Sequence, residues 1–464
     1  MTFNSLQFLV FFMVVTLWFF RMKQQKGRIL LLLLASCYFY MSFIPEYILI
    51  LGGTIAVDYF AGLLIEKKEG SARKFWLVMS LIANIGVLAV FKYYNFFIDN
   101  IHTGALFFGK SVTLPILKIA LPIGLSFHTF QAMSYTIEVY RKNQQAERNF
   151  IVYALYVMFY PQLVAGPIER PQNILAQLKE YRPYDWNNAK EGLSRMLWGF
   201  FKKVVVADRL AMITERTYAH IHDSSSLALF AGAVFYSFQI YCDFSGYSDI
   251  ALGAAKVMNI RLMENFNQPY LSRGISEFWS RWHISLSSWF RDYVYIPLGG
   301  NRKGKLRHKL NVIVVFLLSG LWHGANWTFV VWGLLHGLLV ILLIQRKKEN
   351  EGEKKPFIAI ARAITSFMLV TFLWIFFRSE SITAAWAYIT EIFRWHSGSN
   401  YIGINRVELL FSIVVIGLML FREKKMPEHF IKNDRSFYLY ALAMAAICYL
   451  LGVFSENQFI YFQF

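Results

Sequence analysis

The sequence is poor in charged residues and in cysteine, and both shortages exclude classes of protein. Only 16% of its 464 residues are charged, whereas soluble domains carry roughly 25%. The three cysteines, Cys37, Cys242 and Cys448, are far apart, and no Cys-x-x-Cys or Cys/His metal spacing accompanies them. The composition therefore argues against an ordinary soluble domain, a disulfide scaffold and a zinc protein, and we expect no bound metal.

Two motifs of soluble hydrolases are also missing. The chain has no Gly-x-Ser-x-Gly sequence, which would place a nucleophilic serine on a sharp strand-to-helix turn. It has no His-Glu-x-x-His sequence, which would hold a catalytic zinc ion on one helix face. Serine esterase and zinc hydrolase chemistry are therefore disfavoured.

Apolar residues, in contrast, are abundant and occur in long runs. The chain is 56% hydrophobic and 18% aromatic, with a mean hydropathy of +0.39. A membrane-crossing helix needs about 20 mostly apolar residues, so the runs predict an all-α, polytopic integral membrane protein with about 10–12 transmembrane helices. Segments 150–165, 192–207 and 226–245 are interrupted by Pro, Gly or charge, and we expect some of them to be re-entrant. The continuous candidates lie near residues 5–20, 29–44, 47–65, 75–98, 113–133, 310–325, 327–345, 357–377, 405–421 and 436–454.

The net charge of +18 is spread over short basic clusters between the apolar runs. This pattern is typical of cytoplasmic loops under the positive-inside rule and not of a nucleic-acid-binding face. Counting spans between the clusters places both termini outside, and Met1–Phe20 is predicted to be a retained first helix rather than a removed signal peptide. The clusters expected to be cytoplasmic are Arg21–Arg28, Lys67–Lys74, Arg141–Arg148, Arg302–Lys309, Arg346–Lys355 and Arg422–Lys432.

Segment 261–309 differs from the rest because its first part is too polar to span a membrane. In residues 275–296, Trp and Tyr alternate with Arg281, Arg291 and Asp292, which predicts an amphipathic helix at the membrane interface or in a cavity. No internal repeat, long linker or low-complexity tail is evident. We therefore predict one integral membrane domain over residues 1–464.

Two histidines are the main candidates for chemistry. His283 lies in Arg281-Trp282-His283 and His323 lies in Gly320-Leu321-Trp322-His323-Gly324, both in strongly apolar surroundings. An ionisable group is costly at membrane depth, and histidine is suited to proton transfer near neutral pH. His323 is either a general base toward a hydroxyl group or a buried histidine that bonds a neighbouring helix, with even odds from spacing alone. His283 would orient a substrate or support His323, or would simply face the headgroups.

Other polar motifs have weaker functional signals. Asp243 and Asp249 lie in an apolar neighbourhood. We favour buried acids paired with Lys or Arg over a polar wall of a reaction chamber or a partner that fixes a base. His336 follows His323 by 13 residues, which at about 100° per residue puts the two on separate helix faces and excludes a metal pair. The Gly and Pro residues of 164–171 predict a re-entrant turn.

Several motifs together resemble the membrane-bound O-acyltransferase family, in particular the bacterial branch that acetylates alginate. The resemblance spans most of the chain. It rests on Phe91–Phe96, Leu121–Phe127, Leu163–Ile168, Asp243–Asp249, Glu264–Tyr270, Phe278–Asn301, Gly320–Ala325 and Phe459–Phe464.

The resemblance implies a ring of tilted helices around a thinned centre, with funnels from both membrane faces meeting near the catalytic histidine. It implies that His323 is this catalytic histidine and that His283 is the second histidine of the bacterial branch. We expect no tightly bound cofactor, with acetyl-CoA or another acyl thioester as co-substrate. A separate SGNH-hydrolase-like protein outside the bacterial cell membrane would complete the transfer. The expected substrate-contacting residues are Trp322, Asn326, Trp282, Arg281, Ser285 and Asp292.

Three activities fit these expectations to different degrees. We favour O-acetylation of an exported or cell-surface polysaccharide, in which His323 deprotonates a sugar or partner serine hydroxyl and His283 orients substrate or stabilises an oxyanion. The D-alanyl-transferring subunit of teichoic acid modification is a related alternative. A transporter or scaffold of a polysaccharide-modifying assembly, without bond chemistry, is the alternative from another class.

Overall fold

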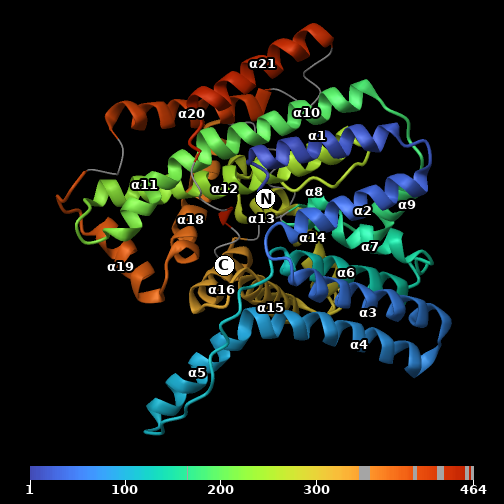
Figure 1. The fold of residues 1–464 in the computed structure, drawn as a ribbon. Helices are drawn as coiled ribbons and strands as arrows, with labels where there is room; N and C mark the ends of the chain where they lie inside the picture. Colours follow the sequence, from blue (N-terminus) through green and yellow to red (C-terminus); the bar gives the residue numbers. More distant parts are fainter. Residues whose placement is uncertain (165, 344–355, 401–404, 426–432, 455–458, 461–464) are drawn as a thin grey trace. The chain divides into compact units, whose positions relative to one another are not determined.

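The computed structural model describes residues 1–464 except 165, 344–355, 401–404, 426–432, 455–458 and 461–464. Within the described residues every element longer than a single β-bridge is a helix (Figure 1). The predicted all-α class is therefore confirmed. The basic cluster Arg346–Lys355, most of Arg422–Lys432 and the end of the Phe459–Phe464 motif lie outside the described residues.

The chain forms two compact units, which are described separately. Unit 1 comprises Met1–Gly192 with Ala251–Met263, and unit 2 comprises Leu193–Ile250 with Glu264–Phe464. The single membrane domain expected from the sequence stays a prediction.

Unit 1 is built from apolar helices, and its α3, α4 and α6 are joined by buried polar groups. Asp58 of α3 accepts hydrogen bonds from Ser80 Oγ (2.6 Å) and Asn84 Nδ2 (2.8 Å) of α4. Such interhelical bonds satisfy polar groups that lipid cannot. Its elements are α1 (Leu6–Arg21), α2 (Gln25–Met41), α3 (Tyr47–Lys67), α4 (Gly70–Leu88), η1 (Ala89–Tyr93), α5 (Tyr94–Phe107), α6 (Leu125–Tyr140), α7 (Phe150–Met158), α8 (Tyr160–Leu163), α9 (Pro171–Lys179) and the start of α10 (Trp186–Phe200).

Three basic clusters of unit 1 converge on α9 and on the turn that follows α6. Clusters 21–28, 67–74 and 141–148 lie far apart in sequence, yet each is tied to this region by hydrogen bonds or ion pairs. This arrangement agrees with the prediction that the three clusters share one membrane face. The contacts are Gln25 Nε2 to the Leu178 carbonyl (2.5 Å), Arg73 Nη2 to the Tyr140 carbonyl (2.6 Å), Arg148 to Glu66, and Lys179 to Glu147 (2.5 Å).

Unit 2 contains the long α12 (Ser226–Val257), whose last residues belong to unit 1, and the helices that carry both candidate histidines. The helix α12 runs without a break through the segment 226–245, so this one of the three interrupted segments is a continuous helix. The other elements are η2 (Phe201–Ala207), α11 (Asp208–Ala219), η3 (Pro269–Leu271), α13 (Ile275–Arg281), α14 (Ile284–Phe290), η4 (Arg291–Tyr295), α15 (Lys305–His323), α16 (Trp327–Leu342), α18 (Pro356–Arg378), α19 (Ile382–Phe393), α20 (Arg406–Lys425) and α21 (Asp434–Leu451).

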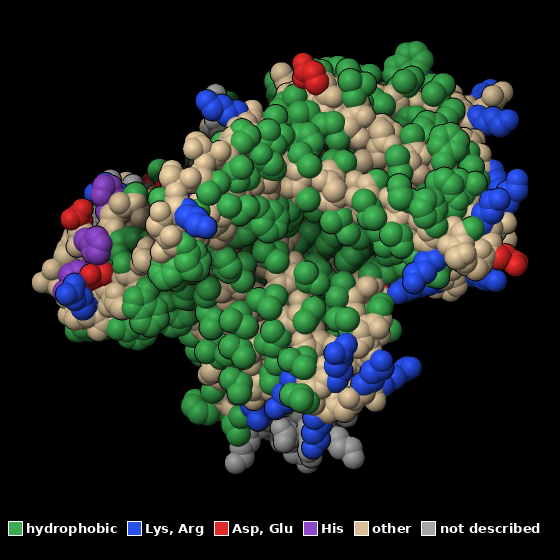
Figure 2. Space-filling model, turned by 90° about the horizontal axis from the view of Figure 1, so that it is seen from below, with side chains coloured by type: hydrophobic (Ala, Val, Ile, Leu, Met, Phe, Trp, Pro, Cys, Tyr) green, Lys and Arg blue, Asp and Glu red, His purple; other side chains and the backbone are tan. Residues whose placement is uncertain are grey.

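Four helices in the described residues are long and apolar enough to cross a membrane, namely Tyr47–Lys67, Gly70–Phe107, Ser226–Val257 and Phe357–Arg378. Shorter apolar helices accompany them, and large hydrophobic side chains are exposed over much of the face in Figure 2. The protein is thus a polytopic membrane protein, whereas a count of 10–12 spans stays a prediction.

The expected span at 113–133 is wrong. Residues 110–122 have no regular structure, and α6 begins only at Leu125, after Gly124. Gly124 has a left-handed φ of 74°, and a Cβ there would lie 2.5 Å from the Leu163 carbonyl oxygen. This left-handed residue starts the helix in the middle of a continuous apolar run, which hydropathy alone does not detect.

The α15–α16 pair is held at close range by two glycines. A Cβ at Gly320 would lie 2.2 Å from the Phe329 carbonyl oxygen, and one at Gly333 would lie 2.3 Å from the Phe316 carbonyl oxygen. Each helix backbone therefore packs directly against the other, as small residues allow in membrane proteins. This contact fixes the position of His323, three residues after Gly320.

We expect Gly320→Ala and Gly333→Ala each to destabilise the protein by about 1–3 kcal/mol, because the added methyl group must push the helices apart. Thermal unfolding in detergent would measure the loss. Gly417→Ala in α20 is the matched control, since a Cβ there meets nothing within 4 Å. Equal stability of all three variants would contradict the close packing.

Candidate active site

His323 is the last residue of α15, and its side chain is buried with 4% exposure. Three aromatic rings surround the imidazole: Trp322, Trp332 and Phe377 have ring centroids 5.0, 5.1 and 5.2 Å from it. The next helix begins at Trp327, capped by the Asn326 side chain, which accepts a hydrogen bond from the Thr328 N–H. The chain thus reverses within a few residues and packs the imidazole among rings.

His283 lies between α13 and α14, in a left-handed conformation with a φ of 43°. This conformation is uncommon for a residue with a side chain and persists only where the surroundings enforce it. The imidazole is almost fully buried, at 1% exposure, and meets the Phe244 ring edge-on at 4.7 Å. The break between the two short helices therefore places His283 at a defined position in the core of unit 2.

Asn265 fixes the proton on His283. Its Oδ1 lies 3.0 Å from His283 Nδ1 and accepts bonds from the Ser285 N–H (3.3 Å) and Ser285 Oγ (2.9 Å). Since an amide oxygen only accepts, His283 carries its proton on Nδ1 and leaves Nε2 as the acceptor. Burial lowers the pKa of His283 to about 3. The ring is therefore neutral near pH 7, and Nε2 can accept a hydrogen bond from a hydroxyl group but cannot donate one to an oxyanion.

Trp322 brings the two histidine motifs together. Its ring lies 5.0 Å from His323 and 6.0 Å from His283, measured between centroids. The two histidines are 40 residues apart in sequence, yet both lie against the same indole. The structure thus places the two candidates in one site.

His336 was set aside in the sequence analysis, but it lies in the same aromatic cluster. Trp332 lies 4.8 Å from His336 and 5.1 Å from His323, and Trp279 Nε1 donates to His336 Nδ1 at 3.3 Å. The rule of 100° per residue holds only within one continuous helix. It cannot relate His323 to His336, because α15 ends at His323 and a new helix starts at Trp327. Trp332 and His336 are four residues apart, and this spacing makes two side chains neighbours on a helix surface. The sequence could therefore have indicated that the two rings lie together.

The absence of a bound metal stays a prediction. The described residues contain no group of three His, Cys, Asp or Glu side chains that could hold a metal ion.

The other predicted substrate contacts fall into two groups. Trp282 and Ser285 are buried beside His283, and Trp282 packs against Phe266 (5.1 Å) and Trp374 (5.0 Å). The remaining three each have a partner within the chain, and a role in substrate binding stays a prediction for all five residues. Arg281 pairs with Glu277 (2.6 Å), Asp292 with Arg291 (2.9 Å), and Asn326 Nδ2 donates to the Glu380 carbonyl (3.0 Å).

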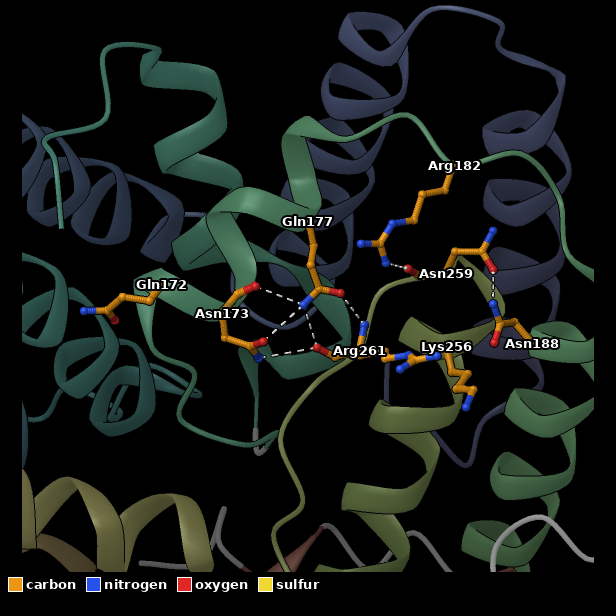
Figure 3. A pocket seen from close by; sticks show the side chains of 8 residues that line it. All are labelled: Gln172, Asn173, Gln177, Arg182, Asn188, Lys256, Asn259 and Arg261. Carbon is orange, nitrogen blue, oxygen red and sulfur yellow. Dashed lines mark hydrogen bonds between the residues drawn. The ribbon is translucent and has the colours of Figure 1, made fainter. Parts of the chain in front are cut away.

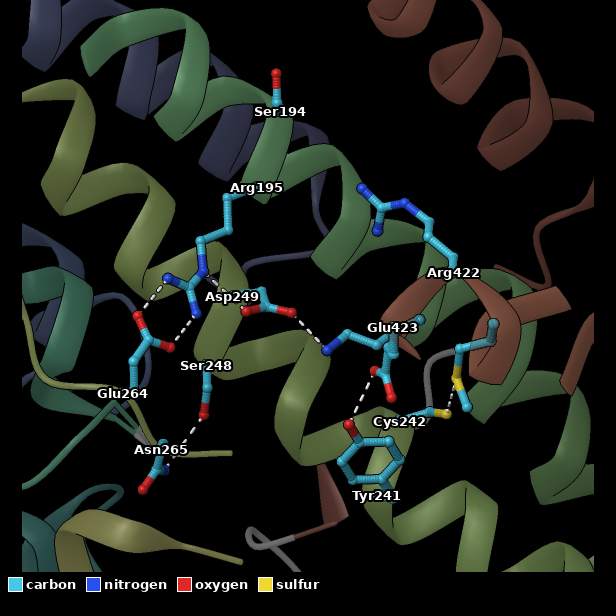
Figure 4. A network of polar contacts seen from close by, with 12 residues as sticks. Ser194, Arg195, Tyr241, Cys242, Ser248, Asp249, Glu264, Asn265, Arg422 and Glu423 are labelled. Carbon is cyan, nitrogen blue, oxygen red and sulfur yellow. Dashed lines mark hydrogen bonds and ion pairs between the residues drawn. The ribbon is translucent and has the colours of Figure 1, made fainter. Parts of the chain in front are cut away.

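An ion-pair network on α12 borders the segment that holds Asn265. Figure 4 shows Arg195 between Asp249 and Glu264, with Nε 2.9 Å from Asp249 Oδ1 and Nη1 2.6 Å from Glu264 Oε1. Lys202 Nζ lies 2.5 Å from the other oxygen of Asp249. The network anchors the segment that begins at Glu264.

A second buried cluster lies around Asp243. Lys203 Nζ lies 2.7 Å from Asp243 and 2.9 Å from Asp208, and Asp243 Oδ2 accepts a bond from the Ile460 N–H at 2.7 Å. The prediction that both acids of the 243–249 motif pair with Lys or Arg is therefore confirmed. Lys202 and Lys203 are consecutive and belong to the π-helix η2, a type of turn that often occurs at functional sites.

Comparison with known proteins identifies the family of the chain. Residues 81–377 match the family model of the membrane-bound O-acyltransferase (MBOAT) family. The chain is 39% identical over 395 residues to "Probable alginate O-acetylase AlgI" of Pseudomonas aeruginosa, covering 85% of this chain and 75% of that protein. It is 37% identical over 383 residues to "Peptidoglycan O-acetyltransferase" of Helicobacter pylori (76% and 71%). It is 29% identical over 256 residues to "Teichoic acid D-alanyltransferase" of Streptococcus thermophilus (50% and 60%). The chain therefore belongs to the membrane-bound O-acyltransferase family and is a multi-pass membrane O-acyltransferase.

Proposed function

We propose that the protein transfers an acetyl group from a cytoplasmic thioester, such as acetyl-CoA, to a hydroxyl group outside the bacterial cell membrane. The acceptor is an exported or cell-surface polysaccharide, or a serine of a separate SGNH-hydrolase-like partner that passes the group on. The observation that carries the proposal is the placement of His323 and His283 against one indole, Trp322. The names of two similar proteins, an alginate O-acetylase and a peptidoglycan O-acetyltransferase, favour a glycan acceptor.

His323 acts as the general base. Its imidazole takes the proton of the acceptor hydroxyl while the hydroxyl oxygen attacks the thioester carbonyl carbon. The tetrahedral intermediate then collapses, the carbon–sulfur bond breaks, and the imidazolium returns the proton to the leaving thiolate. The products are an O-acetyl ester and a free thiol. A positioned base of this kind contributes roughly 10²–10⁴-fold to the rate.

His283 orients the acceptor in this scheme. Its Nδ1 proton is held by Asn265, so Nε2 accepts a hydrogen bond from a hydroxyl. The sequence left two roles open for His283, orienting the substrate or stabilising an oxyanion. The proton on Nδ1 favours the orienting role.

We assign the role of oxyanion donor to Trp332, whose ring contacts His323, and to His336, whose ring contacts Trp332. Trp332 Nε1 and His336 Nε2 are buried and have no hydrogen-bond partner in the part of the chain that the structure describes. Trp279 is a pure donor to His336 Nδ1, so the His336 proton sits on Nε2. Both groups are thus N–H donors in a dry aromatic cluster, where a developing negative charge is stabilised most strongly.

We expect Asn265→Ala to lower kcat by roughly 10-fold to 100-fold, the range seen when a partner that orients a functional histidine is removed. Asn265→Asp keeps an acceptor for Nδ1 and should restore much of the rate. The measurement is acetyl transfer by purified protein at several pH values, with kcat and KM separated. Ser280→Ala, on the same segment, is the control, and an unchanged kcat in Asn265→Ala would contradict the orienting role.

The test of the proposed function is the acetyl content of cell-surface polysaccharide, measured by NMR in a deletion strain with and without the restored gene. Acetyl groups that return with the gene would support O-acetylation and begin to name the polymer. Loss of D-alanyl esters instead would favour the teichoic acid alternative. Translocation of a group without cleavage of the donor would favour a transporter, and unchanged esters would exclude the proposal.

A further inference from the structure

Unit 1 contains a polar pocket that the proposed mechanism does not use. The pocket has a volume of about 490 Å³ and is lined by three cationic and five amide side chains (Figure 3). No apolar or acidic residue belongs to the lining. Its size falls in the range of small-molecule sites, roughly 300–1,000 Å³, but its lining is unsuited to an acyl chain.

The three cations are Arg182, Lys256 and Arg261, and two of them have carboxylate partners. Arg182 Nε lies 3.0 Å from Glu180, and Lys256 Nζ lies 2.5 Å from Glu191. Within the described residues, Arg261 forms no ion pair. Arg261 is thus the lining cation without a carboxylate partner in the part of the chain that the structure describes.

Gln177 holds the backbone of Arg261, a residue that lines the pocket, in place. Gln177 Oε1 accepts from the Arg261 N–H at 2.8 Å, and Gln177 Nε2 donates to the Arg261 carbonyl at 2.9 Å. Asn188 similarly donates to Asn259 Oδ1 at 2.9 Å. The amides therefore form a bonded frame for the pocket wall, and its position does not depend on the ligand.

The pocket lies on the side of unit 1 that is predicted to be cytoplasmic. Gln172, Asn173 and Gln177 belong to α9, the helix that the basic clusters 21–28 and 141–148 contact through Leu178 and Lys179. Clusters of this kind mark the cytoplasmic face. A ligand of this pocket would therefore come from the cytoplasm or from the inner leaflet.

We propose that this pocket binds the phosphate groups of an anionic ligand. Arginine binds phosphate through two parallel N–H bonds, and amide side chains add further donors. Two sources share this chemistry: the phosphates of a coenzyme A thioester, and the headgroup of an anionic phospholipid. If the ligand is the coenzyme A thioester, the pocket is the donor site, and this assignment rests on the proposed function. If the ligand is the phospholipid, the assignment is independent of that function.

The experiment uses the full chain carrying His323→Ala, which binds the donor but does not turn it over. The protein is placed in phosphatidylcholine nanodiscs, and coenzyme A binding is measured by calorimetry. Adding Arg261→Gln should weaken binding about 10-fold or more, as expected for loss of a hydrogen bond to a charged group. Lys256→Gln is a second pocket variant, and Arg302→Gln, an exposed arginine outside the pocket, is the matched control.

Retention of phosphatidylglycerol, followed by native mass spectrometry of the same variants, is the second arm. Weaker coenzyme A binding in the pocket variants alone would identify the thioester donor as the ligand. Unchanged coenzyme A binding with lost phosphatidylglycerol would identify the lipid headgroup. If neither ligand responds to Arg261→Gln or Lys256→Gln, the proposal is overturned. The proposed function would survive that result, because it is judged by acetyl transfer of the wild-type protein.

Discussion

Replacing His323 with alanine is expected to lower acetyl transfer by about 10²–10⁴-fold. The imidazole is the ionisable group that the proposed mechanism assigns to proton removal, and the three aromatic rings around it offer no base to replace it. The measurement is transfer of labelled acetyl from acetyl-CoA by purified protein, at matched folded concentrations.

Two comparisons make the result specific. His102→Ala, an exposed histidine on α5, removes the same side chain from another place and should leave the rate unchanged. His323→Gln keeps a polar side chain of similar length without a base and should be as inactive as the alanine variant. A folded His323→Ala protein that transfers acetyl groups at the wild-type rate would remove His323 from the mechanism.

The second large effect concerns stability. Lys203 is 5% exposed, and Asp208 and Asp243 are each 3% exposed, so all three charges are buried together. Lys203→Met would leave two acids without their cation, and breaking a buried pair in this way costs about 3–5 kcal/mol. Thermal or denaturant unfolding in detergent would measure the loss.

Neutralising the acids tests the cause of that loss. Adding Asp208→Asn and Asp243→Asn to Lys203→Met should recover a large part of the stability, because no unpaired charge is then buried. Lys305→Met, at an exposed position at the start of α15, is the control and should change the stability by less than about 0.5 kcal/mol. A loss below about 1 kcal/mol for Lys203→Met would mean that the pairs add nothing to the folded state.

The sequence was informative wherever one local property decides the structure. Long apolar runs predicted membrane helices, and acids in apolar surroundings predicted cationic partners, which Lys203 and Arg195 supply. The span at 113–133 failed because a single left-handed residue, Gly124, decides where the helix starts. That conformation depends on the close approach of the Leu163 carbonyl, a contact between distant segments.

The candidate site was only partly predictable for a similar reason. His283 and His323 stood out because histidine is costly in apolar surroundings. Their common contact with Trp322, and the Nδ1 proton of His283 that Asn265 holds, depend on packing between distant parts of the chain. His336 was missed because one helical period was applied across Gly324, where the chain changes direction.

The bond from Ile460 to Asp243 has a consequence for biosynthesis. The two residues are separated by 217 positions, and at a translation rate of roughly 5–20 residues per second the donor follows its acceptor by about 10–40 s. During this interval α12 has already been synthesised. Asp243 Oδ2, however, still lacks the Ile460 N–H that donates a hydrogen bond to it in the folded protein. Until residue 460 has been made, Lys203 is thus the partner that can compensate the charge of Asp243 while the helix enters the bilayer.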